Sequence, residues 1–232
     1  MISEGGKAIP SAQPVTLKNF DAVKKNLQKA LPLGIDMYAI GSAGKKEVSS
    51  DVDVLIDAEQ LLDIFPLDDL KLARQALEKH FQNMGLEAKR TGVSIHVGVP
   101  NGEGGVAQVD LMAVNNAQAA QPLHTHDYTD PNMKGGTLHA MWADLANMSA
   151  TPEAESLMMS PYKGLVNRET KELVSNNKDE IAKIIIGPSA TADDMGNPTK
   201  LLKALEPYPK KYDAIKNKYM ATEWSQKWQN LQ

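Results

Sequence analysis

Apolar residues recur at helical spacing in two places in the N-terminal half of the chain. Between residues 16 and 31 they fall at three- and four-residue steps, at Leu17, Phe20, Val23, Leu27 and Leu31. This spacing predicts an amphipathic helix with Thr16 as its N-cap residue. A second amphipathic helix is predicted over residues 69–84, and Gly85 is expected to end it.

Four shorter segments carry the apolar or alternating pattern that is typical of β-strands. They are residues 37–40, 51–57, 94–99 and 107–114. The last two are separated by a Gly-rich segment, which predicts a hairpin loop over residues 100–105. Up to about residue 120, the pattern therefore predicts an α/β body of strands flanked by helices.

Beyond residue 120 the helical spacing dominates. Leu138, Met141, Trp142 and Leu145 share one helical face, and further helices are predicted over residues 180–186 and 199–205. Residues 1–15 contain Gly and Pro without periodicity and are predicted to form an irregular arm. We expect a body over residues 1–120 and a helical C-terminal part over residues 121–232 that packs on it.

Composition narrows the class of protein. With 232 residues, of which 42% are hydrophobic and 23% charged, the chain matches an ordinary globular protein and not a disordered one. No apolar stretch approaches the ~18 residues that span a bilayer. The chain contains no cysteine, which excludes disulfides, thiolate nucleophiles and cysteine-ligated metal sites. Together with an N-terminus unlike a signal peptide, these features predict a cytoplasmic protein with no membrane partner and an unspecified oligomeric state.

Charge is distributed unevenly along the chain. The 25 Lys and Arg residues face 29 Asp and Glu residues, for a net charge of −4, yet seven lysines and only three acidic residues follow position 198. This basic end is either a solvated helical face or a surface for a polyanion. The acidic total argues against strong non-specific DNA binding.

The candidate chemistry begins with two carboxylates on one predicted strand. Asp51 and Asp53 are two residues apart, so on a strand their side chains point to the same face. Carboxylates that close repel one another unless a cation lies between them, and their hard oxygen ligands suit Mg²⁺ or Mn²⁺. Asp110 is an isolated acid in an apolar strand, where a charge is costly unless it is paired or metal-bound. It is the candidate third ligand of a two-metal site.

A Gly-Ser turn directly precedes this pair of carboxylates. Gly41 allows the backbone to approach a ligand closely, while the Ser42 hydroxyl and the N–H groups of the turn can bind phosphate oxygens. Lys45 and Lys46 are candidates to neutralise the same triphosphate. A P-loop is excluded because the positions of its first Gly and of its Ser or Thr are occupied by other residues. The alternative is a flexible hairpin flanked by ordinary strand-edge acids.

In this order, the Gly-Ser turn, the Asp-x-Asp strand and the later Asp resemble the signature of the polymerase-β-like nucleotidyltransferase superfamily. Further stretches are similar to small nucleotidyltransferases of tailed bacteriophages, and the resemblance covers roughly residues 33–190. These stretches are Leu33-Gly34, residues 41–46, residues 49–53, residues 164–170 and residues 179–182.

The resemblance implies a fold, a reaction and a set of site residues. The fold is an α/β (α+β) catalytic core with a mixed β-sheet, and the reaction is Mg²⁺-dependent transfer of an NMP from an NTP, by default ATP, to an acceptor hydroxyl. Asp51, Asp53 and Asp110 correspond to the metal carboxylates, and Gly41 and Ser42 to the phosphate-binding turn. If the protein is phage-encoded, it is expected in the host cytoplasm.

The acceptor is left open by the sequence. Trp224 and Trp228, with Lys216, Lys218 and Lys227 nearby, favour RNA, for example a tRNA 3′ end, through stacking on single-stranded bases. A small molecule or a protein is the alternative acceptor. Two other functions also remain open, namely a non-catalytic nucleotide-binding or virion-associated module of the same fold and a metal-dependent hydrolase.

Four weaker signals each have an ordinary structural alternative. His124 and His126 are candidate zinc ligands or members of a polar loop, and His96 is a substrate contact or a core histidine. Lys134 with the following Gly-Gly pair is a candidate anion site at a helix N-terminus. Candidate contacts to base or triphosphate in the C-terminal part are Tyr162, Lys163 and Arg168.

Overall fold

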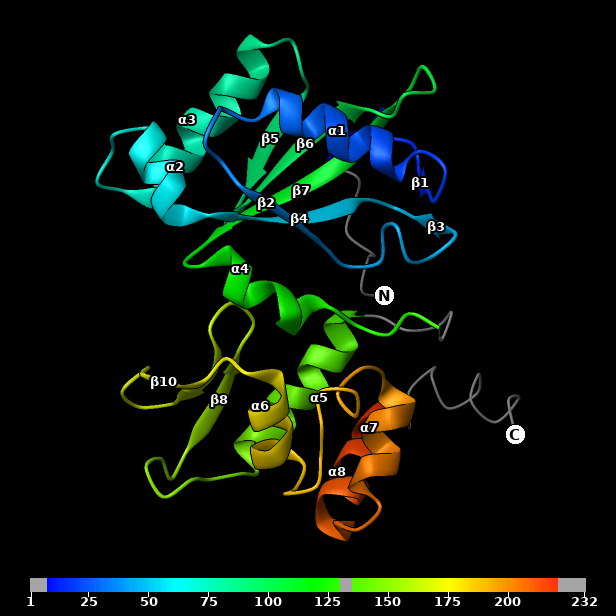
Figure 1. Cartoon of the computed structure of the whole chain (residues 1–232), viewed down its shortest axis with the longest axis vertical. Coiled ribbons are helices and arrows are strands. Elements are labelled where there is room, and N and C mark those ends of the chain that lie inside the picture. The colour runs from blue at the N-terminus through cyan, green and yellow to red at the C-terminus, as the bar shows by residue number, and fades with distance from the viewer. Residues whose placement is uncertain (1–7, 130–134, 221–232) are drawn as a thin grey trace. The chain divides into compact units, whose positions relative to one another are not determined.

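The computed structural model describes residues 8–129 and 135–220 of the chain (Figure 1). The chain divides after Gln121 into two compact units. Lys134, Trp224, Lys227 and Trp228, which the sequence analysis singled out, lie outside the described residues. No helix in the described ranges combines the length and the apolar character needed to cross a membrane.

The first unit is built on a five-stranded sheet with the strand order β2-β4-β7-β6-β5. Its strands are β2 (Met37–Ile40), β4 (Val52–Asp57), β5 (Ala88–Thr91), β6 (Ser94–Pro100) and β7 (Val106–Val114). The central strand β7 runs parallel to its neighbour β4, while the other three neighbouring pairs are antiparallel. The expected α+β fold class with a mixed sheet is confirmed.

Helices and a short ribbon complete this unit. The helices are α1 (Phe20–Ala30), α2 (Ala58–Ile64), α3 (Leu70–Asn83) and α4 (Ala117–Ala120), and the ribbon pairs β1 (Val15–Thr16) with β3 (Val48–Ser49). The prediction of Thr16 as an N-cap is wrong. Thr16 pairs with Val48 in the ribbon, so α1 begins four residues later, after Asn19.

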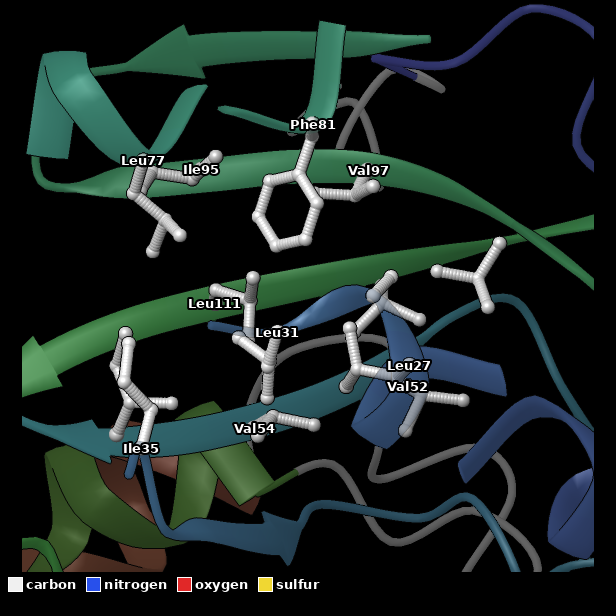
Figure 2. Close-up of a cluster of buried hydrophobic side chains, with 14 of the residues drawn as sticks. Leu27, Leu31, Ile35, Val52, Val54, Leu77, Phe81, Ile95, Val97 and Leu111 are labelled. Atoms are coloured by element: carbon white, nitrogen blue, oxygen red, sulfur yellow. The ribbon is translucent and has the colours of Figure 1, made fainter. Parts of the chain in front are cut away.

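One face of the sheet is covered by helices and forms the core. Val52 and Val54 of β4 point to this face, as do the alternate residues of β6 and β7, and they meet Leu27 of α1 and Phe81 of α3 (Figure 2). These side chains are 0–1% exposed. Burying an aliphatic or aromatic side chain of this size contributes about 1.5–3 kcal/mol. Because side chains alternate along a strand, Asp53 lies on the opposite face.

The second unit contains helices and a small sheet. Its helices are α5 (Gly135–Asn147), α6 (Lys178–Ile185), α7 (Pro198–Leu205) and α8 (Pro209–Met220), and a 3₁₀ turn, η1 (Gln121–His124), crosses the boundary. The strands β8 (Leu157–Ser160), β9 (Gly164–Asn167) and β10 (Leu173–Ser175) form an antiparallel sheet in the order β10-β9-β8. The core of this unit surrounds the fully buried Trp142 of α5.

The sheet of the second unit differs from the expected helical C-terminal part. Each strand is only three or four residues long, too short to display an alternating pattern. The turn before β9 depends on Gly164, which has φ +98°, and a Cβ there would lie 2.4 Å from the carbonyl oxygen of Ser175. This long-range contact is not visible in the local sequence.

Candidate functional site

The face of the sheet opposite α1 and α3 carries a row of polar residues. In the strand register, Asp53 of β4 lies beside Asp110 of β7, Asp110 beside His96 of β6, and His96 beside Lys89 of β5. Directly paired residues in neighbouring strands point to the same face. The register therefore aligns two carboxylates, an imidazole and an ammonium group across four strands.

Asp51 belongs to the same group of charges. It directly precedes β4, two residues before Asp53. Burial first, and then the carboxylates of Asp51 and Asp110, raise the pKa of Asp53 to about 7. The pKa of Asp51 is also raised, mainly by burial and then by Asp110, against a smaller lowering effect of Ser50 and His96. The structure thus brings Asp51, Asp53 and Asp110 within electrostatic reach of one another.

Asp110 accepts two hydrogen bonds through one oxygen. His96 Nδ1 lies 2.8 Å and Gln108 Nε2 lies 2.9 Å from Asp110 Oδ1. The side chains of His96 and Asp110 are only 14% and 18% exposed. Gln108 was missed by the sequence analysis. Its spacing two residues before Asp110 on an otherwise apolar strand is the signal that could have revealed it.

Gly41 follows β2 and brings the turn against Asp53. Its φ is +70°, and a Cβ at this position would lie 2.5 Å from Asp53 Oδ2. Both the left-handed conformation and this close approach require glycine. The predicted phosphate-binding turn and the predicted metal ligands therefore share one space.

The segment after Gly41 forms a tight turn. The carbonyl of Ser42 accepts hydrogen bonds from the backbone N–H groups of Lys45 and Lys46, each at 3.0 Å. The hydroxyls of Ser42 and Ser49 lie 2.9 Å apart. The conformation of the turn is also fixed by Gly44, where a Cβ would lie 2.5 Å from the ring of Phe20.

A cavity of about 320 Å³ lies beside this turn. It lies along β2, and its lining includes Phe20 and Lys24 of α1, Lys45 of the turn, and Gln121. The ammonium group of Lys24 lies 5.3 Å from the centre of the Phe20 ring. Lys46 belongs to the same turn but does not line the cavity. Two cations thus flank an opening next to the Gly-Ser pair.

The donor set of the carboxylate cluster fits a divalent cation. Oxygen ligands suit Mg²⁺ and Mn²⁺, and a cation relieves the repulsion that raises the pKa of Asp53. Within residues 8–129 and 135–220, no three Asp, Glu or His side chains already form a complete cation cage. The cluster therefore has suitable donor chemistry, while its side chains are not closed around a single point.

The weaker candidates of the second unit have structural contacts. His124 Nε2 lies 2.7 Å from the carbonyl oxygen of Pro161, and the rings of His124 and His126 each lie about 5 Å from His139. These three histidines therefore pack together as an aromatic cluster. Arg168 donates hydrogen bonds to Asn147 and to the carbonyl oxygen of Leu157, which gives it a structural role.

Comparison with known proteins gives no family assignment. No protein-family model matches the chain, and no curated protein matches it. Solved structures of terminal uridylyl transferases are similar at low levels. The enzyme terminal uridylyl transferase 4 from Trypanosoma brucei with bound GTP has 16% identity over 60% of this chain and 45% of its own, with a TM-score of 0.34.

Two further structures show the same level of similarity. A cytoplasmic RNA terminal U-transferase has 18% identity over 64% of this chain and 46% of its own, with a TM-score of 0.31. The poly(U) polymerase Cid1 in a MgATP-bound form has 20% identity over 63% of this chain and 47% of its own, again with a TM-score of 0.31. The chain thus spans less than half the length of these proteins. At these TM-scores and identities, the similarity to terminal uridylyl transferases assigns no activity to the chain.

Proposed function

We propose that this chain is a metal-dependent nucleotidyltransferase whose catalytic core lies within residues 1–120. The observation that carries the proposal is the position of Asp53. It lies beside Asp110 on parallel strands, two residues from Asp51, and directly against Gly41 of the turn. A half-buried cluster of carboxylates next to a turn suited to phosphate is the arrangement that transfer from an NTP requires.

In the proposed reaction, the residues divide into two groups. Asp51, Asp53 and Asp110 hold Mg²⁺ or Mn²⁺, which supplies activation of an acceptor hydroxyl and neutralisation of the pyrophosphate. Ser42 and the backbone N–H groups of the turn bind the β- and γ-phosphates, and Lys45 and Lys46 add positive charge. Gly41 keeps these two groups adjacent, since any side chain there would displace Asp53.

The bond changes follow from this placement. The oxygen of the acceptor hydroxyl bonds to the α-phosphorus, and the bond from that phosphorus to the oxygen bridging to the β-phosphate breaks. The products are the nucleotidylated acceptor and pyrophosphate. Asp110 is assigned to take the proton of the acceptor hydroxyl. Because the hydroxyl attacks the α-phosphorus in line with the leaving pyrophosphate, no covalent intermediate forms on the protein.

We assign ATP as the default donor and RNA, such as a tRNA 3′ end, as the acceptor. The support for RNA is the lysine-rich C-terminal region, where α8 carries exposed Lys216 and Lys218. The similarity of residues 33–190 to phage nucleotidyltransferases also stays a prediction.

One observation favours a second candidate, a non-catalytic nucleotide-binding module of the same fold. The described residues contain no complete cation cage, so the carboxylates would have to move to close around an ion. The two candidates differ in one product, because an enzyme releases pyrophosphate with some acceptor and a binding module never does.

The experiment that tests the proposal supplies each α-³²P-labelled NTP with Mg²⁺ or Mn²⁺ and total bacterial RNA and protein. Asp53→Asn serves as the inactive variant, and Lys89→Ala is the control because Lys89 lies in the same row but outside the carboxylate cluster. Label that appears with wild type and Lys89→Ala but not with Asp53→Asn supports the enzyme. Its sensitivity to nuclease or protease identifies the acceptor. Nucleotide binding without any transfer favours the module.

A further inference from the structure

One oxygen of Asp110 accepts hydrogen bonds from two side chains, those of His96 and Gln108. We propose that His96, Gln108 and the backbone N–H of Ile9 form a positioning relay, which fixes one oxygen of Asp110 and leaves the other directed toward Asp53. The proposal rests on the proposed function, because it assumes that Asp110 binds the cation. His96 and Gln108 act through Asp110 and do not themselves contact the substrate.

The direction of the Gln108 amide follows from its two neighbours. The backbone N–H of Ile9 can only donate, and it lies 3.1 Å from Gln108 Oε1. The oxygen of the amide is therefore turned toward Ile9, and its NH₂ group is turned toward Asp110 at 2.9 Å. In a flipped amide, the NH₂ group would face the N–H donor of Ile9, and the amide oxygen would face the acceptor oxygen of Asp110.

The same reasoning fixes the hydrogen on His96. An ionised carboxylate only accepts, so His96 Nδ1, at 2.8 Å from Asp110 Oδ1, carries the hydrogen. Two donors thus converge on Oδ1. Because β7 lies between β6 and β4 in the sheet, His96 draws Oδ1 toward the β6 side. Asp110 Oδ2 is then the oxygen directed toward Asp53 on β4.

The N-terminal arm supports this relay from outside the sheet. Ile9 is fully buried, and its side chain lies over Gly98, where a Cβ would approach Ile9 Cγ2 to 3.2 Å. Gly98 is the register partner of Gln108. The arm is fastened by the hydrogen bond from the Gln13 N–H to the Val106 carbonyl oxygen at 2.8 Å. Within the predicted irregular arm, residues 9–13 thus contact the strands that carry His96, Gln108 and Asp110.

The test measures Mn²⁺ binding to the full chain by electron paramagnetic resonance, without nucleotide. Partners that orient a metal ligand typically account for about 10–100-fold in metal affinity. We expect His96→Leu and Gln108→Leu to weaken Mn²⁺ binding by this factor. We expect His96→Asn, whose amide can donate from nearly the same position as Nδ1, to restore most of it. Lys89→Ala, which removes a neighbouring cation of the same row, should leave the affinity within about two-fold of wild type.

A fourth variant separates positioning from simple charge. Gln108→Glu adds a negative charge near the cluster and would strengthen Mn²⁺ binding if charge alone mattered. If the relay is correct, this substitution replaces the NH₂ donor that faces Asp110 with a carboxylate oxygen, which repels Asp110 Oδ1. We therefore expect weaker Mn²⁺ binding, and tighter binding by this variant would overturn the relay.

The controls distinguish failure of the relay from failure of the proposed function. Thermal melting identifies any leucine variant that does not fold, and His96→Asn and Gln108→Glu then decide the result. If folded His96→Leu binds Mn²⁺ as wild type does, the relay is wrong while the proposed function stands. If wild type binds no Mn²⁺ and releases no pyrophosphate, both are wrong.

Discussion

At the scale of single residues, Asp53 lowers the stability of the metal-free fold, while the proposed activity requires it. It is half-buried beside two other carboxylates, and its pKa of about 7 reflects desolvation first and their repulsion second. Without a cation, this arrangement opposes folding. A residue of this kind is retained at a functional site at the expense of stability.

Replacing Asp53 by Asn is expected to separate these two properties. The amide keeps the shape and removes the charge, so the metal-free protein should gain about 1–3 kcal/mol at pH 8. Transfer activity should fall at least about 100-fold, because the metal ligands act together. Urea denaturation in EDTA measures the first effect and pyrophosphate release the second. A variant that is less stable than wild type in EDTA contradicts the electrostatic explanation.

A second prediction at this scale concerns Gly41. Gly41→Ala combines left-handed backbone strain with a clash against Asp53 Oδ2. The matched control is Gly85→Ala at the end of α3, which has a similar φ of +79° but nothing within 4 Å of the added Cβ. We expect about 1 kcal/mol of destabilisation for Gly85→Ala and at least twice that for Gly41→Ala.

The same pair of variants also tests function. Gly41→Ala should greatly reduce transfer activity, since it displaces Asp53, whereas Gly85→Ala should retain it. Urea denaturation and the transfer assay together check both expectations. Equal effects of the two substitutions would show that the approach of the turn to Asp53 has no role.

At the scale of elements, helix α3 has a defined start that stabilises the covered face of the sheet. The side chain of Asp69 accepts hydrogen bonds from the backbone N–H groups of Lys71 at 2.6 Å and Leu72 at 3.2 Å. These two groups would otherwise lack a partner within the helix. Leu77 and Phe81 of the same helix are fully buried in the core.

Removal of this cap should reduce stability without changing the site. Asp69→Ala is expected to cost about 1 kcal/mol, while Asp68→Ala, one residue earlier and exposed, should have little effect. Both variants should keep the transfer activity of wild type at 25 °C, since α3 covers the face opposite the polar row. Denaturant titration gives the comparison, and equal stability of the two variants would contradict the assigned N-cap.

At the scale of the whole molecule, the two units should respond to acid in opposite directions. In the first, the raised pKa of Asp53 means that the folded state binds more protons than the unfolded state between about pH 4 and 7. Its metal-free form should therefore become more stable as the pH falls through 7. In the second unit, the pKa of His139 is lowered to about 3, mainly by burial and then by the nearby His124 and Lys178.

The second unit should accordingly lose stability on acidification. Unfolded His139 takes up a proton near pH 6.5 and the folded residue does not, which costs up to about 2 kcal/mol by pH 5. Hydrogen exchange in EDTA at pH 7.5 and 5.5, corrected for intrinsic rates, should show less protection in α5 and more in β4 and β7 at the lower pH. His139→Leu should remove the loss in α5. Protection that changes in the same direction in both units would contradict the opposite pKa shifts.

Local features of the molecule were determined by the sequence itself. The period of the apolar residues predicted helices within residues 16–31 and 69–84, because an amphipathic helix buries one face. The alternation of side chains along a strand predicted that Asp51 and Asp53 point to the same side, since this alternation depends only on backbone geometry. These relations connect residues that are close in the chain.

Only the tertiary structure decided the relations between distant segments. The strand order and register put Asp110 between Asp53 and His96, although Asp110 is 57 residues from Asp53 in the sequence. The same register aligns Gln108 with Gly98 under Ile9, and long-range pairing of Thr16 moved the N-cap of α1 from Thr16 to Asn19. Such pairings depend on non-local backbone hydrogen bonds and on which face is buried, and no local period encodes them.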